Sequence, residues 1–163
     1  MMNSILIDTH AHVWDRSCAL VPGARYRPDY EATIDTYLGV LDAHGIERAV
    51  LVQPSFLGTD NRYLLDCLRA YPDRLRGIVV ISEDATSEEI EDMRSVGVIG
   101  MRFNLIGRDA SVMKSKPAGE LVDRVVQQNW FVEVHVDGEY LSDVLTVLKS
   151  HRSKVIVDHF GRP

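Results

Sequence analysis

Short β-branched runs alternate with longer stretches of helical periodicity along the chain, and this alternation constrains the fold more than any other feature. The runs that we assign to strands lie at residues 5–8, 49–53, 77–81, 98–103, 131–136 and 154–158. Most of them are continuously apolar, which is typical of strands buried on both faces of a parallel sheet. The stretches between them carry apolar residues at helical spacing, as crossover helices do. The sequence therefore predicts an α/β fold of six successive strand–helix units.

Local signals mark where the intervening helices begin and end. Gly45 follows an apolar stripe and suits the left-handed residue just past a helix. Thr86 and Glu89 have the spacing of a capping box at a helix start. Pro117 suits the first turn of a further helix. No linker rich in Pro, Gly or Ser divides the chain, so one domain is the simplest interpretation.

Two architectures share this pattern of units: an open doubly wound sheet and an eight-stranded barrel of the (β/α)8 type. The first predicted strand runs into Asp-Thr-His-Ala-His at residues 8–12 and not into a glycine-rich loop, which disfavours a dinucleotide site. A complete barrel takes about 250 residues. The 163 residues of this chain would therefore hold roughly two thirds of one.

The charge balance narrows the classes of partner. The chain has 18 Lys and Arg against 24 Asp and Glu, a formal net charge of −6. This balance disfavours nucleic acids and anionic membranes as partners held by broad electrostatic attraction. No apolar run approaches the roughly 20 residues of a membrane-spanning helix, and the start lacks a basic leader. We therefore expect a cytoplasmic protein.

Histidines cluster where the predicted strands end. His10 and His12 follow the first strand, and their two-residue spacing places them on one face, where they suit paired ligands or hydrogen-bond donors. His135 ends the fifth strand, and His159 follows the sixth. The alternative is that the first two are ordinary loop residues and that His135 is a satisfied core residue. If the sheet closes into a barrel, these strand ends would converge at the active-site face.

Arg102 lies inside an otherwise apolar strand, where a guanidinium is costly to bury unless an anion meets it. Its planar fork suits a substrate carboxylate, and Arg108, six residues later, suits a second one. The alternative is an internal salt bridge from Arg102 to Glu133 or Asp8. Ser55, in the loop after the second strand, offers a hydroxyl but lacks the context of a nucleophile.

Four segments, taken in order along the chain, resemble the lactonases of the amidohydrolase superfamily. They are residues 8–14 (DTHAHVW), 52–56 (VQPSF), 100–104 (GMRFN) and 158–163 (DHFGRP). The resemblance is strongest to the 2-pyrone-4,6-dicarboxylate lactonases. It implies a distorted (β/α)8 barrel that hydrolyses a carboxylated lactone by means of an activated water molecule. Residues 1–163 would then form a single incomplete barrel domain, whose open sheet edges would invite self-association.

The resemblance also assigns roles to individual residues. Three histidines would surround and polarise the lactone carbonyl: His10, His12 and His159. Four residues would hold the carboxylates or the ring of a small-molecule substrate: Ser55, Arg102, Arg108 and Arg162. The family's general base is an aspartate at the end of the eighth strand, which no residue of this chain matches. We therefore expect the chain to be a truncated part of a longer hydrolase.

Alternatives to this function remain open. The dicarboxylate lactonases work without a metal, so the resemblance implies no cofactor. Other members of the superfamily bind a divalent metal such as zinc, for which His10, His12 and His135 are the alternative ligands. The chain is then either a metal-dependent hydrolase or decarboxylase, or a non-catalytic remnant that binds carboxylates.

Overall fold

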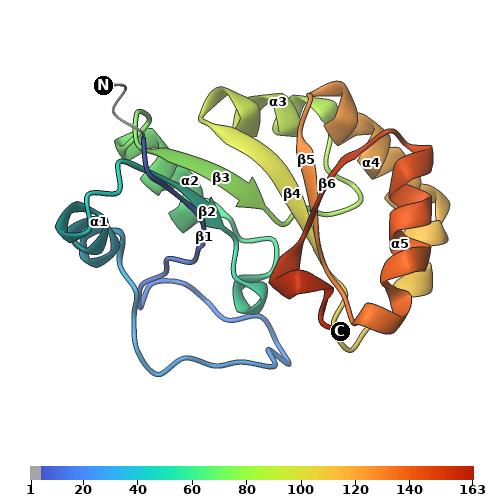
Figure 1. Cartoon of the computed structure of the whole chain (residues 1–163), viewed down its shortest axis with the longest axis horizontal. Coiled ribbons are helices and arrows are strands. Elements are labelled where there is room, and N and C mark those ends of the chain that lie inside the picture. The colour runs from blue at the N-terminus through green and yellow to red at the C-terminus, as the bar shows by residue number, and fades with distance from the viewer. Residues whose placement is uncertain (1–4) are drawn as a thin grey trace. The chain divides into compact units, whose positions relative to one another are not determined.

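The computed structural model describes residues 5–163, in which six strands alternate with five α-helices (Figure 1). The strands are β1 (Ile7–Ala11), β2 (Arg48–Val52), β3 (Leu75–Val79), β4 (Val98–Asn104), β5 (Phe131–His135) and β6 (Lys154–Val157). The α-helices are α1 (Ile34–Ala43), α2 (Arg62–Ala70), α3 (Ser87–Ser95), α4 (Lys116–Gln127) and α5 (Gly138–Ser150). Short 3₁₀ helices occupy Ser55–Leu57, Ala110–Lys114 and Asp158–Gly161. None of the helices among residues 5–163 is long and apolar enough to cross a membrane.

The chain divides into two compact units. The first comprises the described residues up to Val79 together with Val96–Val98. The second comprises Val80–Ser95 and Ile99–Pro163. Each unit is built from parallel strands with helices between them, as the sequence predicts.

In the first unit, β1, β2 and β3 pair in parallel in that order. Its core includes Leu51 of β2 and Leu75 of β3, both fully buried. Gly77 of β3 makes room for α2, because a Cβ there would lie 2.8 Å from Leu68 Cδ1 and 2.9 Å from Leu64 Cδ2. The missing side chain lets the helix pack closely on the strand.

In the second unit, β4, β5 and β6 pair in parallel in that order. The helices α4 and α5 lie on one side of these strands (Figure 1). Leu121 of α4, Leu148 of α5, and Val132 and Val134 of β5 are fully buried. Val132 and Val134 share one face of β5, and Glu133, which is 1% exposed, lies on the other, so both faces of the strand are covered.

The local signals in the sequence are confirmed. Gly45 has a φ of 66° just beyond α1. The Thr86 N–H donates to Glu89 Oε2 at 2.7 Å, and the Glu89 N–H donates to Thr86 Oγ1 at 3.2 Å, which completes the capping box. Pro117 lies in the first turn of α4. These signals succeed because each depends on residues that are neighbours in the chain.

The first strand differs from its predicted bounds of 5–8. β1 runs from Ile7 to Ala11, so His10 lies within the strand and not beyond it. Ile5, Leu6 and Ile7 remain about half exposed, at 49%, 53% and 51%. The apolar run at residues 5–8 therefore begins before the strand, and pairing with β2 sets the bounds of the strand.

Self-association through open sheet edges stays a prediction.

The backbone at the start of α5 closely approaches the chain after β6, and this contact can be tested. The Gly138 N–H donates to the Arg162 carbonyl at 3.1 Å, and a Cβ at Gly138 would lie only 2.6 Å from that oxygen. We expect Gly138→Ala to lower the free energy of unfolding by about 1–3 kcal/mol. Gly39→Ala, in α1 with open space around the added methyl group, should raise it by up to about 1 kcal/mol. Urea unfolding measures both, and a neutral Gly138→Ala variant would contradict the close approach.

Candidate functional site

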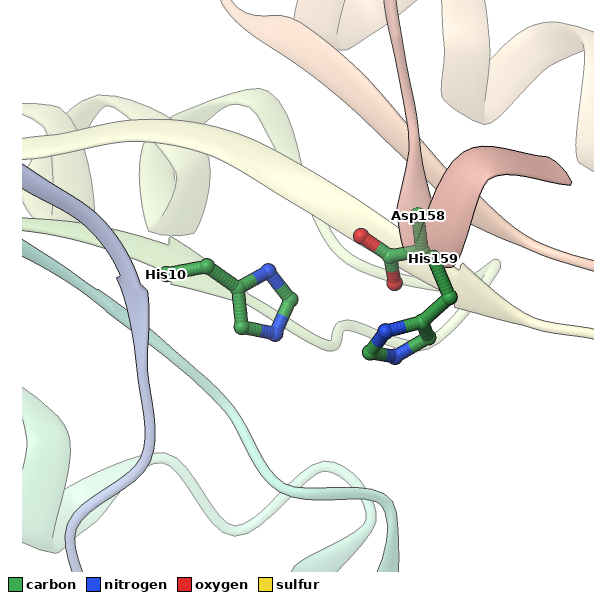
Figure 2. Close-up of side chains that lie close together, drawn as sticks. All are labelled: His10, Asp158 and His159. Atoms are coloured by element: carbon green, nitrogen blue, oxygen red, sulfur yellow. The ribbon is translucent and has the colours of Figure 1, made fainter.

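His10 and His12 lie together at the carboxyl end of β1. Figure 2 shows the His10 side chain projecting from this strand. The two ring centroids are 5.0 Å apart with an interplanar angle of 81°. The pairing of these two rings agrees with their two-residue spacing. The first unit therefore presents two imidazoles at one strand end.

The tautomer of His12 follows from one hydrogen bond. His12 Nδ1 lies 2.7 Å from the Val52 carbonyl oxygen, which can only accept. Nδ1 must therefore carry the proton and donate it. In the neutral ring, Nε2 then holds a lone pair, and it donates a hydrogen bond only when the ring is an imidazolium.

The backbone of His10 is held by an acidic side chain. The His10 N–H donates to Asp8 Oδ1 at 3.1 Å. The Tyr37 hydroxyl of α1 donates to Asp8 Oδ2 at 2.9 Å. Burial, followed by the Asp8 carboxylate, raises the pKa of Tyr37, so its hydroxyl keeps its proton. This connection joins α1 to the histidine-bearing end of β1.

Ser55 is an exposed residue on a loop that a buried amide holds in place. It begins the 3₁₀ helix that follows β2. Gln53 is 1% exposed, and its Nε2 donates to the carbonyls of Gly58 at 3.2 Å and Asp60 at 2.8 Å. Gly58 has a φ of 55°, and a Cβ there would lie 2.7 Å from Val21 Cγ1. The hydrogen bonds of Gln53 and the close packing at Gly58 therefore fix the loop that carries Ser55.

The second unit is organised around a buried group of charges. Arg102 of β4 lies directly opposite Glu133 of β5, and its Nε is 3.0 Å from Glu133 Oε1. The same Nε donates to Asp158 Oδ2 at 2.8 Å, and Nη2 donates to that oxygen at 2.5 Å. The three side chains are only 1–3% exposed. The Glu133 partner that the sequence offered as an alternative for Arg102 is confirmed, with Asp158 as a second carboxylate.

This arrangement changes the protonation of Glu133. Burial, followed by the nearby Asp158 charge, raises the pKa of Glu133 to about 8, and the positive charge of Arg102 opposes the shift only in part. Glu133 is therefore protonated at neutral pH. One cation, one carboxylate and one neutral acid leave the group uncharged overall, which suits its burial.

His135 and His159 lie next to this charged group. His135 Nδ1 is 3.3 Å from Arg102 Nη2, which can only donate, so Nδ1 accepts and the neutral ring carries its proton on Nε2. Burial, followed by the Arg102 charge, lowers the pKa of His135 to about 4. The ring centroids of His135 and His159 are 4.7 Å apart. The second unit therefore also contains a pair of imidazoles at its strand ends.

His159 begins a turn with unusual backbone geometry. Asp158 and His159 follow β6, as Figure 2 shows. The φ angles of residues 159–162 are 49°, 55°, 75° and 46°, so the backbone makes a left-handed turn. Three of these residues are not glycine, and each adopts this conformation at a cost of roughly 1–2 kcal/mol. Backbone strain of this kind clusters at functional sites.

Two of the arginines predicted to bind the substrate, Arg108 and Arg162, are solvent-exposed. Arg162 Nε lies 3.5 Å from Asp137 Oδ1 in a weak surface ion pair. Arg108 lies in the loop after β4, and within residues 5–163 its side chain forms no hydrogen bond or ion pair. The guanidinium of Arg108 is therefore available to an anion from solution.

A family model for amidohydrolases matches residues 7–163. The chain belongs to the amidohydrolase family. Among relatives of this amidohydrolase, the 2-pyrone-4,6-dicarboxylate hydrolase of Comamonas testosteroni is 26% identical over 159 residues, which cover 96% of the chain and 52% of that protein. The 4-sulfomuconolactone hydrolase of Rhizobium radiobacter is 30% identical over 161 residues, which cover 95% and 52%. The chain thus spans about half the length of these relatives.

Solved structures confirm the fold class of this amidohydrolase. A probable 2-pyrone-4,6-dicarboxylic acid hydrolase from Acinetobacter baumannii, with citric acid bound, is 40% identical with a TM-score of 0.93, covering 98% of the chain and 60% of that structure. A zinc-bound amidohydrolase from Burkholderia multivorans, at 17% identity and a TM-score of 0.75, shares the fold, covering 98% and 59%. The fold is therefore α/β of the (β/α)8 type, with six strands and five α-helices within residues 5–163.

Two residues of these units were not predicted from the sequence as contributors in their own right. Tyr37 of α1 had no predicted role, and Glu133 was predicted only as a partner for Arg102. The signal for Glu133 was a carboxylate inside the apolar run at residues 131–136. No sequence signal identified the hydroxyl of Tyr37 as a partner for Asp8, because the two are 29 residues apart.

The buried ion pairs predict a large effect of removing the cation. We expect Arg102→Met to lower the free energy of unfolding by about 3–5 kcal/mol, because it leaves two buried carboxyl groups without their cation. Adding Glu133→Gln should restore part of the loss. Arg94→Met removes an exposed pair with Glu91 on α3 and should leave stability nearly unchanged. Urea unfolding compares the variants, and equal losses at both arginines would contradict the buried group.

The raised pKa of Glu133 predicts a dependence of stability on pH. Between pH 6.5 and 8 the folded chain keeps the Glu133 proton, whereas the unfolded chain has lost it. Stability should therefore fall as pH rises through this window, by about 1 kcal/mol per pH unit. The lowered pKa of His135 acts below this window, where it reduces stability as pH falls from 6.5 towards 4. Glu133→Gln should flatten the slope between pH 6.5 and 8, and an unchanged slope would show that Glu133 does not hold the proton.

Proposed function

We propose that this chain carries the carbonyl-polarising and carboxylate-binding residues of a hydrolase that opens small carboxylated lactones with an activated water molecule. The observation that carries the proposal is the occurrence of histidines at the carboxyl ends of β1 and β5 and just after β6, in a chain of the amidohydrolase family. Relatives named as hydrolases of a pyrone dicarboxylate and of a sulfomuconolactone support a lactone as the substrate.

The histidines would act on the lactone carbonyl. Attack by water places negative charge on the carbonyl oxygen, and fixed N–H donors stabilise that charge. We assign this role to His10, His12 and His159. His12 fulfils it as an imidazolium, because its Nδ1 proton is already donated to Val52 and only the second proton lets Nε2 donate. The ring ester bond then breaks to give a carboxylate and a hydroxyl group. We assign no residue of this chain as the general base.

Arginines and a hydroxyl would hold the substrate's carboxylates. Arg108 is exposed and free of ion pairs among residues 5–163, and we assign it one carboxylate. Arg162, with its weak surface pair, and Ser55, on its clamped loop, would assist. Arg102 is only 3% exposed and uses Nε and Nη2 for Asp158, so we limit its role to a contact of Nη1 with a substrate carboxylate. The citric acid bound to the Acinetobacter baumannii structure supports a site for polycarboxylates.

A metal-dependent hydrolase is the second candidate, and the hydrogen bond from His12 to Val52 favours it. Histidine ligands of metals commonly donate their other ring N–H to a backbone carbonyl. His10 and His12 would hold a divalent cation, which would polarise the carbonyl or acidify a bound water molecule. His135 fits this ligand set less well, because its Nδ1 lone pair faces the Arg102 guanidinium. Loss of activity on chelation, with recovery on adding zinc, would select this candidate over the metal-free one.

Turnover of a lactone dicarboxylate tests the function. The chain should hydrolyse 2-pyrone-4,6-dicarboxylate, followed by the loss of pyrone absorbance and by acid release at constant pH. Arg108→Gln should raise KM about tenfold through loss of a charge-assisted bidentate contact, with a smaller change in kcat. Arg69→Gln is the matched control, because it removes an exposed arginine of α2 whose ion pair within residues 5–163 is with Asp66. Thermal stabilisation by the lactone or by citrate without turnover would instead identify a carboxylate-binding protein.

A further inference from the structure

The most prominent irregularity of the first unit lies beside His10. β1 and β2 pair at Asp8 with Ala49 and again at Ala11 with Leu51, so β1 takes three steps where β2 takes two. One residue of the Thr9–His10 segment is therefore extra to the ladder, which is the definition of a β-bulge. Bulges occur next to active sites, where they redirect a side chain. The direction of His10 thus depends on what holds this bulge.

Asp8 adds a side-chain hydrogen bond to the backbone at the bulge. Its Oδ1 accepts from the His10 N–H at 3.1 Å, across two residues of the same strand. A carboxylate acceptor makes such a bond stronger than a neutral carbonyl would. The bond closes the bulge locally and restricts the backbone from which the His10 imidazole projects.

Tyr37 fixes the carboxylate itself. Its hydroxyl donates to Asp8 Oδ2 at 2.9 Å, so the two carboxylate oxygens have one donor each from different elements. Tyr37 is half-buried on α1, next to the fully packed Leu38. A rigid helix therefore holds Asp8, and Asp8 holds the bulge.

We propose that Asp8 and Tyr37 form a bulge clamp that positions His10 for the reaction, with Tyr37 acting through Asp8 and not on the substrate. The inference rests on the proposed function for its kinetic consequence, but the clamp itself is a property of the first unit alone. A helix-borne hydroxyl is well suited to this role, since supporting hydrogen bonds from rigid elements are what hold functional side chains in a productive geometry.

Tyr37→Phe separates the clamp from simple packing, because it removes only the hydroxyl and keeps the ring. Exchange of the His10 amide hydrogen, followed by NMR of the ¹⁵N-labelled chain, should become about tenfold faster as the Asp8 acceptor loosens. The kcat for the lactone should fall about tenfold with little change in KM, because a misplaced catalytic group affects the transition state more than substrate binding. A general loss of stability would instead accelerate the exchange of many amides together.

Tyr71→Phe is the matched control. Tyr71 follows α2, and its hydroxyl donates to Asp35 of α1 at 3.4 Å. The variant therefore removes the same chemical group from another tyrosine–aspartate pair of the first unit without touching Asp8. We expect its His10 amide exchange and its kcat to equal those of the unmodified chain.

A double-variant cycle tests whether Tyr37 acts through Asp8. In an Asp8→Ala background, Tyr37→Phe should change neither the exchange at His10 nor kcat any further. Asp8→Asn, which keeps one acceptor oxygen, provides a milder background should Asp8→Ala fail to fold. Independent, additive effects of the two substitutions would overturn the clamp.

The clamp and the proposed function fail in distinguishable ways. If Tyr37→Phe leaves exchange at His10 unchanged, the clamp is overturned whether or not the chain turns over lactone. If exchange accelerates but kcat is unchanged, Tyr37 does not position His10 for catalysis. If the unmodified chain shows no lactone turnover, the proposed function fails, while the exchange data still decide whether the clamp exists.

Discussion

The packing of the second unit depends on neutralising one buried cation, the guanidinium of Arg102. Arg102 projects from an apolar strand, and its guanidinium meets Glu133 from the neighbouring strand and Asp158 from the chain after β6. Two carboxylates against one cation would leave a net charge in the interior, and the proton on Glu133 removes it. Arg102 thereby connects β4, β5 and the segment after β6, and the same cation orients the lone pair of His135.

In the first unit, the side chains at the strand ends are held by hydrogen bonds that involve neutral groups and one carboxylate. His12 donates to a backbone carbonyl of β2, the Gln53 amide fixes the loop that carries Ser55, and Asp8 closes the bulge at His10. In both units, some of the polar side chains near the carboxyl ends of strands are held by hydrogen bonds from neighbouring elements. Pre-organisation of this kind is what allows histidine donors to stabilise a developing charge.

Much of the fold could be predicted because its signals are local. Continuous apolar runs located all six strands to within a few residues, and the Thr86–Glu89 capping box and Gly45 marked helix ends correctly. The bounds of β1 were wrong, since pairing with β2 extends the strand through His10. The resemblance in four short segments predicted the family and the barrel fold. The family match over residues 7–163 and the solved structures confirm both.

The sequence by itself determined the order of strands and helices, the family and the identity of the polar residues at the strand ends. Only the tertiary structure decided how those residues are protonated and held. The tautomer of His12 depends on a carbonyl 40 residues away, and the Arg102 pair with Asp158 spans 56 residues. Hydrogen-bond partners and burial set the charge of a side chain, and neither can be read from its neighbours along the chain.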